Sequence, residues 1–413
     1  MDLGLERIMA VLKALGLGHP PYATVHVVGT NGKGSTALFL AGLAKAHGLC
    51  AGLYTSPHFL TPRERIRIDG RMLSEADWLD LANQVRGVSK HIGPTYFEFI
   101  TAMAVPAFAR AKVDVAVLEA GLGGRFDATR ALPADLTLFT KIGLDHENVL
   151  GRTVEEIARD KAGAIRPRSE VICAPQQKEV WDVLQDEAEN QGARIRLCSD
   201  VLHISWPERR VRPAPGVAGP ELENAKLEVM GSHQRENAHL ALSAWYALTE
   251  IKGFEIAPRA CGKALAQTRL PGRLQRVPGD PDLLLDGAHN ENAMQSLALA
   301  LAEENIVPKA LIFTCLADKN LDRVAPAAKG LTQGTIYVPG LPGISRARRP
   351  EDLAQALGPR AVAVPDVAEA LKKVRGIEGW VIICGSLYLL AEFFKLRPEC
   401  LREPSEIYHL QAG

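Results

Sequence analysis

The 413-residue sequence lacks the features that mark several specialised classes of protein. Its seven cysteines are scattered and form no Cys-x-x-Cys pair, which argues against a disulfide framework or a zinc site. No apolar run is long enough to span a membrane, and the acidic start Met1-Asp2-Leu3-Gly4 does not resemble a signal peptide. We therefore expect a cytoplasmic protein with reduced thiols and no membrane partner.

The sequence also lacks an excess of charge of either sign. Lysine and arginine together number 48, as do aspartate and glutamate, so the formal net charge is zero. A general binder of polyanions usually carries a basic excess, and we therefore expect no nucleic-acid partner. The hydrophobic content of 47% and the charged content of 23% are those of an ordinary globular protein, and the length predicts two domains.

Apolar strands alternate with helical segments along the chain. Strands are predicted at 25–28, 50–54, 113–118, 135–142 and 171–174, and again at 282–286, 310–315, 335–338, 361–364 and 380–384. This alternation predicts an α/β fold with a doubly wound, mostly parallel sheet. We assign residues 1–270 to a P-loop domain with a small β insertion near 194–230, residues 271–274 to a linker, and residues 275–413 to a smaller Rossmann-like α/β domain.

The stretch from Val25 to Thr36 reads as a buried strand, a glycine-rich turn and the start of a helix. Such a turn points backbone N–H groups and a helix N-terminus at a phosphate. Lys33 adds a positive charge, and Ser35 or Thr36 can offer a hydroxyl to the phosphates or to Mg²⁺. The spacing Gly-x-x-Gly-Lys-Gly-Ser is shorter than the usual P-loop pattern, and the alternative is a glycine-rich turn with a solvated lysine. We predict a nucleotide-phosphate site.

Polar residues follow several of the apolar strands. Ser56, Glu119 and His146 stand at carboxyl ends of strands, where ligands bind in open parallel sheets. An acidic residue in this position commonly helps to hold Mg²⁺, so Glu119 is a candidate metal ligand; the alternative is a capping carboxylate. His146 alone is more often a structural histidine, and its candidacy rests on the strand before it and on Asp145 beside it.

Two further motifs carry weaker signals. Lys161 lies near the end of a predicted helix, where a lysine is usually solvated. Asp286-Gly-Ala-His289-Asn290 follows the first strand of the second domain, where it can face the nucleotide or form a capped turn. By spacing alone, the sequence predicts a two-domain Mg²⁺-nucleotide enzyme with its site in the cleft.

Taken together, the motifs resemble a known family. They occur in the order G-T-N-G-K-G-S, T-S-P-H-F, E-R-I-R, T-Y-F-E, L-E-A-G-L-G-G-R-F-D-A-T, G-L-D-H, D-K-A-G-A-I, L-P-G-R and D-G-A-H-N. This order resembles the folylpolyglutamate synthase/dihydrofolate synthase family, within the Mur-ligase-like ATP-dependent amide ligases. The resemblance runs from Asp2 to about Leu389. It implies that ATP phosphorylates a substrate carboxylate, that the amine of L-glutamate attacks the acyl phosphate, and that the protein is a monomer.

The resemblance also implies roles for individual residues. Lys33, His146 and Lys161 are expected in catalysis, and two Mg²⁺ ions are expected on Ser56, Glu119, His146 and a carbamylated Lys161. Contacts to ATP are expected from Thr30, Asn31, Gly32, Lys33, Gly34, Ser35, Asn237, Arg273, Asp286 and His289. Contacts to the pterin substrate are expected from Asp2, Leu3, Gly4, Thr95, Tyr96, Phe97, Glu98, Phe126 and Asp127, which favours a bifunctional enzyme. Arg130 departs from the family, which more usually has asparagine in D-A-T-N.

Alternative functions stay open at this stage. One is folylpolyglutamate synthesis alone, and another is a ligase that adds an amino acid to a UDP-sugar peptide of the cell wall. Enzymes of the latter kind usually carry an extra N-terminal domain, whereas about 24 residues precede the first strand here. The non-enzymatic alternative is a nucleotide-dependent switch, which would not need so full a set of metal ligands. We therefore expect a folate ligase.

Overall fold

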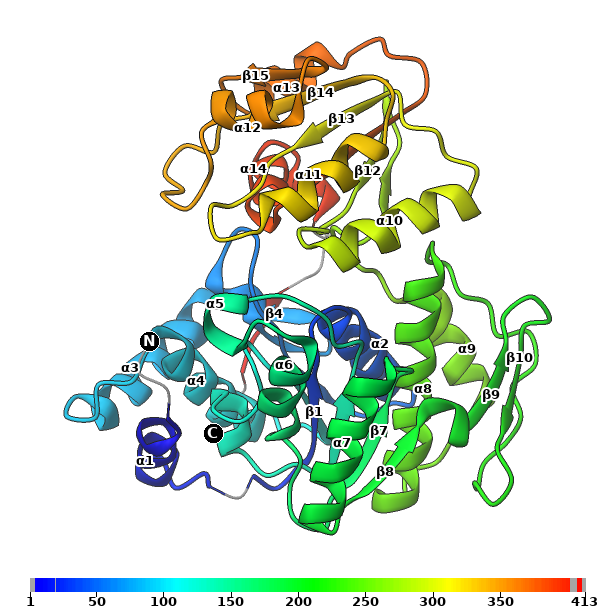
Figure 1. The fold of residues 1–413 in the computed structure, drawn as a ribbon. Coiled ribbons are helices and arrows are strands. Elements are labelled where there is room, and N and C mark those ends of the chain that lie inside the picture. The colour runs from blue at the N-terminus through cyan, green and yellow to red at the C-terminus, as the bar shows by residue number, and fades with distance from the viewer. Residues whose placement is uncertain (1–3, 19, 402–406, 411–413) are drawn as a thin grey trace.

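The computed structural model describes residues 4–18, 20–401 and 407–410, and it contains two large β-sheets in separate bodies (Figure 1). The larger sheet has nine strands in the order β17-β4-β3-β2-β5-β1-β6-β7-β8. Its strands are β1 (Ala23–Val28), β2 (Ala51–Tyr54), β3 (Ile66–Ile68), β4 (Arg71–Leu73), β5 (Val115–Glu119), β6 (Leu136–Phe139), β7 (Glu170–Cys173), β8 (Arg194–Leu197) and β17 (Ile407–Tyr408). Strand β3 is antiparallel to both neighbours, whereas β2, β5, β1, β6, β7 and β8 are parallel. The predicted α/β fold with a mostly parallel sheet is confirmed.

Helices cover both faces of this sheet because its central strands are apolar on both faces. Val25 and Val117 pack against helices on one side, and Ala116 and Leu118 pack against helices on the other. The first side carries α2 (Lys33–Ala46), α8 (Ser232–Lys252) and α9 (Pro258–Gln267). The second side carries α1 (Glu6–Ala14), α3 (Glu75–Ser89), α4 (Tyr96–Arg110), α6 (Val154–Ala162) and α7 (Lys178–Gln191). Burial on both faces explains why these strands read as continuous apolar runs.

Short helices connect these elements. They are α5 (Glu147–Leu150) and the 3₁₀ helices η1 (Pro62–Arg65), η2 (Ala128–Ala131), η3 (Cys198–Asp200) and η4 (Pro398–Cys400). The small β insertion begins later than predicted, because β8 pairs in parallel with β7 at the edge of the larger sheet. Strands β9 (Leu202–Ser205) and β10 (Arg210–Pro213) form the separate antiparallel pair. Charged and apolar residues alternate in β8, and this pattern fits an edge strand as well as an insertion.

The second body contains a six-stranded sheet in the order β11-β12-β16-β13-β14-β15. Its strands are β11 (Gln275–Val277), β12 (Asp282–Leu285), β13 (Ala310–Phe313), β14 (Thr335–Pro339), β15 (Ala361–Val364) and β16 (Trp380–Cys384). Strand β11 is antiparallel to β12, and the other pairs are parallel. One face packs against α10 (Glu291–Glu303), α11 (Leu321–Gly330) and α12 (Pro350–Leu357), and the other against α13 (Val367–Lys373) and α14 (Leu387–Leu396).

The end of the chain returns to the first body (Figure 1). Strand β17 pairs in parallel with β4, and Leu410 donates its backbone N–H to Asp77 Oδ2 at 3.1 Å. Residues 407–410 therefore do not lie with the second sheet, contrary to the predicted assignment of 275–413. A strand of two residues carries too little pattern to be predicted from the sequence.

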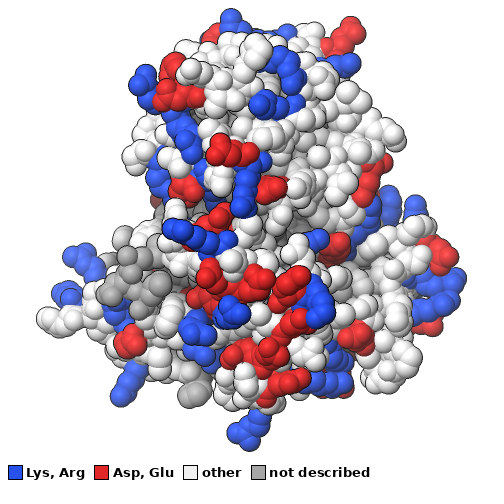
Figure 2. Space-filling model, in the orientation of Figure 1, with Lys and Arg blue, Asp and Glu red and all other residues white. Residues whose placement is uncertain are grey.

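The two bodies meet at a narrowed waist, and charges of both signs are mixed over the face shown in Figure 2. No helix in the described ranges has both the length and the apolar character needed to cross a membrane. Polar contacts across the waist include those between the loops after β1 and β6 and the loops after β12 and β13. Arg235 on α8 also pairs with Glu303 on α10, and Phe59 packs on Phe394 of α14. The carboxyl ends of strands from both sheets therefore face a common space.

Candidate active site

The predicted phosphate loop connects β1 to α2. Gly29 has φ of 150° and Gly32 has φ of 89°, both in the region that favours glycine. A Cβ at Gly29 would overlap Thr140 Oγ1, and one at Gly32 would overlap Asn237 Oδ1 on α8. These two glycines let the backbone turn sharply and approach its neighbours closely. Asn237 consequently lies against the loop, as its predicted contact with ATP requires.

Lys33 begins α2 and folds back over this loop. Its Nζ donates hydrogen bonds to the carbonyl oxygens of Gly29 and Thr30, each at 3.1 Å. Burial lowers the pKa of Lys33, and the negative charge of Glu119 opposes that shift. The ammonium group is therefore held at the loop where the phosphates are predicted to bind.

Glu119 ends β5 and is only 5% exposed. Its Oε2 accepts the backbone N–H of Ser56 at 2.8 Å, so the ends of β5 and β2 meet at this carboxylate. Burial raises the pKa of Glu119, while the charge of Lys33 opposes the shift. A Cβ on Gly34 would lie 3.4 Å from Glu119 Oε1, which places the first turn of α2 beside it. The structure thus brings Ser56, Glu119 and the phosphate loop together.

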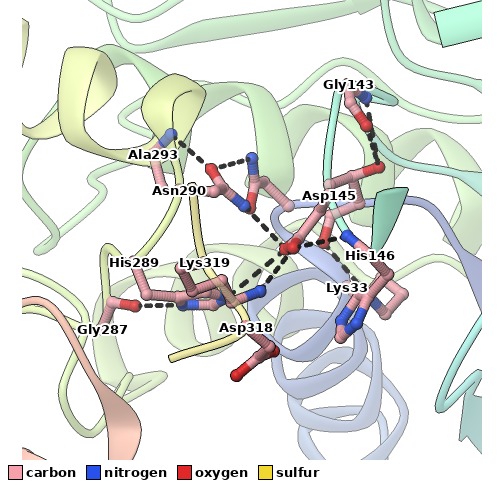
Figure 3. Close-up of polar contacts among 12 residues, drawn as sticks. Lys33, Gly143, Asp145, His146, Gly287, His289, Asn290, Ala293, Asp318 and Lys319 are labelled. Carbon is pink, nitrogen blue, oxygen red and sulfur yellow. Dashed lines mark hydrogen bonds and ion pairs between the residues drawn. The ribbon is translucent and has the colours of Figure 1, made fainter. Parts of the chain in front are cut away.

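Lys161 contacts the same loop, and His146 lies beside Lys33 (Figure 3). His146 has φ of 53° at the start of α5, and burial lowers the pKa of its imidazole to about 4. Lys161, on α6, is 4% exposed and donates from Nζ to the carbonyl of Gly29 at 2.8 Å. Burial, and then the charge of Lys33, lowers the pKa of Lys161 to about 7. At neutral pH the imidazole is therefore neutral, and much of the Lys161 amine is neutral too.

The donor set around Glu119 fits a magnesium ion that is shared with phosphate. No group of three or more His, Cys, Asp and Glu side chains in the described ranges could hold a metal without other ligands. Mg²⁺ is commonly bound through one or two carboxylates together with water and substrate phosphates. Glu119 is a buried carboxylate that makes no ion pair among the described residues. Buried charges are usually paired or bound to a metal, so a cation beside Glu119 would stabilise its ionised form.

A polar cluster joins the two bodies beside this site (Figure 3). Asp145, after β6, accepts from Asn290 Nδ2 at 2.9 Å and from the backbone N–H of His146 at 2.8 Å. It forms ion pairs with Lys319 and, at 3.4 Å, with His289 Nε2. Burial alone would raise the pKa of Asp145, but the hydrogen bond from His289 and the charges of His289 and Lys319 hold it well below its usual range. The carboxylate is therefore fully ionised.

The same cluster reaches the phosphate loop. Asn31 and Asn290 exchange two amide hydrogen bonds, of 3.3 and 3.1 Å. Lys319 is buried between the bodies, although we did not predict a role for it. It stands in the loop that follows the apolar strand β13, six residues beyond Phe313, much as His146 follows β6. A search of the loops after apolar strands would therefore have found it.

The other predicted nucleotide contacts lie around the linker. Asp286 accepts the backbone N–H groups of Leu274 and Ala288, at 2.9 and 2.8 Å, so it acts in this structure as the turn-capping carboxylate. The guanidinium of Arg273 lies so close to Gly287 that a Cβ there would overlap it. His289 Nδ1 contacts the carbonyl of Gly287 at 2.7 Å, and its Nε2 faces Asp145.

The predicted pterin residues fall into two groups, those that already form hydrogen bonds within the protein and those that are exposed. Glu98 accepts from Arg7 Nε at 3.0 Å and caps α4 together with Thr95, whose backbone N–H it accepts at 2.7 Å. Asp127 accepts the backbone N–H groups of Gly121 and Leu122, at 2.8 and 2.9 Å. These two carboxylates therefore hold the local structure.

The predicted aromatic pterin residues are more accessible to a ligand. Tyr96 is 56% exposed, and Arg65 lies over its ring at 5.4 Å. Phe126 is 45% exposed, and Phe97 is half-buried and packs on Gly121. Gly4 lies just before α1, whereas Asp2 and Leu3 fall outside the described residues.

Comparisons with known proteins find similar sequences and structures. A family model described as the Mur ligase glutamate ligase domain matches residues 272–387. The dihydrofolate synthase/folylpolyglutamate synthase of Bacillus subtilis is 32% identical over 405 residues, which cover 95% of this chain and 94% of that protein.

Solved structures are similar over nearly the whole chain. The Yersinia pestis bifunctional folylpolyglutamate synthase/dihydrofolate synthase, complexed with AMPPNP and a manganese ion, has 31% identity and a TM-score of 0.86, covering 96% of this chain and 94% of that one. Escherichia coli FolC in complex with DHPP and ADP has 30% identity and a TM-score of 0.86, covering 97% and 95%. The chain therefore belongs to the folylpolyglutamate synthase/dihydrofolate synthase family.

Proposed function

We propose that this protein joins L-glutamate to the carboxylate of dihydropteroate, of glutamylated tetrahydrofolate, or of both, with ATP as the energy source. The observation that carries the proposal is the convergence of Lys33, Glu119, His146 and Lys161 around one glycine-rich loop (Lys33 and His146 are drawn in Figure 3). The names and nucleotide complexes of the relatives support it. We further infer a cytoplasmic monomer. Seven cysteines without a disulfide support the location, and only the family resemblance supports the monomer.

The reaction proceeds in two balanced steps. An oxygen of the substrate carboxylate attacks the γ-phosphorus of ATP, the bond to the β-phosphate oxygen breaks, and an acyl phosphate and ADP result. The glutamate amine then attacks the acyl carbon, the bond to the phosphate oxygen breaks, and the amine loses a proton as the amide forms. Phosphorylation is needed because an oxide ion is a poor leaving group, whereas phosphate leaves readily.

The residues of this chain would position and neutralise the reacting phosphates. Lys33 and the N–H groups at the start of α2 would face the transferring phosphoryl group. Ser56, Glu119, His146 and Lys161 would hold two divalent cations, which supply charge neutralisation to the phosphates when they are bound. Asn237, Arg273, Asp286 and His289 would surround the nucleotide from α8, the linker and the second body, and closure of the two bodies would keep water from the acyl phosphate.

We propose that Lys161 is carbamylated. Its neutral amine would attack carbon dioxide, forming an N–C bond and releasing one proton, so that a cation becomes a carboxylate-like anion. The pKa of about 7 supports this step because only the neutral amine is nucleophilic. The change would also replace repulsion from Lys33 with attraction. A ¹³C carbamate signal in protein equilibrated with labelled bicarbonate, absent from Lys161→Arg, tests the modification.

Exposed aromatic rings at Tyr96 and Phe126 support a flat pterin substrate nearby. Glu98 and Asp127, however, are already engaged in protein contacts, which favours folylpolyglutamate synthesis alone as the second candidate.

Phosphate release with Mg-ATP and L-glutamate tests the proposal, with dihydropteroate and tetrahydrofolate supplied separately. Turnover with both substrates supports the bifunctional enzyme, and turnover with tetrahydrofolate alone supports the second candidate. We expect Lys33→Ala to lower kcat by about 10²- to 10³-fold, the usual cost of removing one group that stabilises transition-state charge. Unchanged circular dichroism is the control for folding. The proposal is rejected if neither substrate gives phosphate release.

A further inference from the structure

A second candidate binding site lies at the amino ends of strands in the larger sheet, whereas the phosphate loop follows the carboxyl end of β1. It is an open pocket of about 430 Å³ between the segments that lead into β6, β7 and β8. Strands β1 and β6 run parallel, and the carboxyl end of β6 leads to Asp145 and His146. The pocket therefore lies at the amino end of the same strand whose other end forms the nucleotide site.

The pocket carries positive charge that the protein does not neutralise. Arg166, Arg168 and Arg194 line it, and none of them forms an ion pair with another described residue. Two acidic residues also line it, but both have other partners. Asp135 pairs with Lys252 at 2.6 Å, and Glu170 pairs with Arg196 at 2.6 Å.

The protein behind the pocket adds a further unpaired cation. Arg166 Nη2 donates to the carbonyl oxygens of Arg130 and Leu132, which brings the two arginines together. The Nε atoms of Arg130 and Arg166 are both buried, and neither has an acceptor among the described residues. The positive charge of Arg130 acts on Arg166, so an anion in the pocket beside Arg166 would be favourable.

Buried polar side chains of β1 and β6 are also unpartnered. Thr24, His26 and Thr137 are at most 1% exposed, and Thr24 Oγ1, His26 Nε2 and Thr137 Oγ1 have no hydrogen-bond partner among the described residues. Burial, followed by the charges of Arg166 and Arg130, lowers the pKa of His26 to about 3. The imidazole is therefore neutral. The one carboxylate that a described contact places beside these side chains is Asp135, which accepts the backbone N–H of Thr24 at 2.8 Å and is already paired with Lys252.

We propose that this pocket binds a small anion with at least two negative charges, either a phosphate group or a pair of carboxylates. Arg166 would form the inner contact, and Arg168 and Arg194 would close over the ligand from the rim. A planar guanidinium matches both groups because it presents parallel N–H donors to two oxygens. The proposal goes beyond the proposed ligase function and does not depend on it, since binding is measured without turnover.

Calorimetric titration of inorganic phosphate into the full chain tests the site. Saturating ADP and Mg²⁺ occupy the nucleotide site, and sodium chloride keeps the ionic strength constant. We expect one phosphate to bind, and we expect Arg168→Ala/Arg194→Ala to raise its Kd at least tenfold while phosphate release by the enzyme stays unchanged. The control is Arg86→Ala, an exposed arginine on α3 outside the pocket, which should leave the Kd unaltered.

A second arm replaces phosphate with a γ-linked triglutamate, which offers adjacent carboxylates. Binding of triglutamate alone, with the same loss in the double variant, assigns the site to carboxylate pairs, and binding of phosphate alone assigns it to phosphate. The proposal is overturned if neither ligand binds, or if wild type and double variant bind equally. Arg166→Met adds a test of the inner contact, provided that its circular dichroism matches wild type.

Discussion

Two polar clusters lie at different heights along the strands of the larger sheet. They differ in whether their buried polar atoms have hydrogen-bond or ion-pair partners. Around Asp145, one carboxylate receives hydrogen bonds or ion pairs from His146, His289, Asn290 and Lys319. Around His26, five buried polar atoms have no partner among the described residues. Both clusters contain charged groups, so composition alone does not distinguish them.

The difference indicates what each cluster is for. A buried charge is costly unless it is paired, and the Asp145 cluster obtains its pairs by joining two bodies of the molecule. The loop that we propose binds the phosphates takes part through Asn31, so it is in direct contact with the second body. In the His26 cluster, Arg166 reaches two backbone carbonyls, but five buried polar atoms obtain no partner from the described residues. Unsatisfied buried atoms of this kind are consistent with a ligand in the adjoining pocket.

The largest expected effect is on the Asp145 cluster. Asp145→Asn leaves the buried ammonium of Lys319 without its charged partner, and we expect the free energy of unfolding to fall by about 3–5 kcal/mol. Urea unfolding measures this change. The matched control is Asp318→Asn, which removes a partly exposed ion pair with Arg346 and should cost about 0–1 kcal/mol. Equal losses in the two variants would show that the Asp145 pair contributes no more than a surface pair.

The next effect concerns pH and the His26 cluster. The pKa of His26 is about 3 in the folded protein and about 6.5 when the chain is unfolded, so between these values the unfolded state binds the extra proton. The stability that His26 contributes is therefore present above pH 6.5 and is lost as the pH falls towards 3. Between pH 6.5 and 4.5, wild type should lose about 2–3 kcal/mol more than His26→Leu, measured by urea unfolding. Parallel pH profiles for the two proteins would contradict this assignment.

A smaller effect is expected at the amide pair between the bodies. A double-mutant cycle with Asn31→Ala and Asn290→Ala removes the two mutual hydrogen bonds. We expect a coupling of about 1 kcal/mol in the free energy of unfolding, which the cycle separates from the capping contact of Asn290 with Ala293. Additive losses would show that the contact between the bodies is not energetically coupled to the phosphate loop.

The smallest effect distinguishes an unpartnered hydroxyl from a partnered one. Thr137→Val removes a buried hydroxyl that has no partner among the described residues, and it should be neutral or stabilise the protein by about 1 kcal/mol. Thr101→Val is the comparison, because Thr101 Oγ1 donates to the carbonyl of Phe97 at 2.8 Å and lies 2.9 Å from the hydroxyl of Tyr54. That variant should cost about 1–3 kcal/mol. Thermal unfolding ranks the two, and equal losses would remove the distinction.

Sequence patterns predicted the elements that depend on local properties. Strands β1, β5 and β6 can be recognised in the sequence as mostly apolar runs because each strand is buried on both faces. The turn at Gly29 and Gly32 can be recognised in the sequence because its backbone angles favour glycine. The fold class and the family resemblance therefore follow from the chain alone, whereas the return of β17 to the first sheet does not, because two residues show no period.

Pairing between distant residues was decided only by the tertiary structure. Asp145 and Lys319 are 174 positions apart, and no local pattern indicates that they meet. The sequence likewise marked Glu98 and Asp127 as pterin contacts, although the fold also uses both to hold backbone N–H groups. Arg130 and Arg166 acquire significance only because folding brings them together with their Nε atoms buried, and neither forms an ion pair with another described residue. Apolar burial leaves a periodic trace in the chain, but a hydrogen bond depends on the position of two atoms to within a few tenths of an ångström, and only the packed structure sets that position.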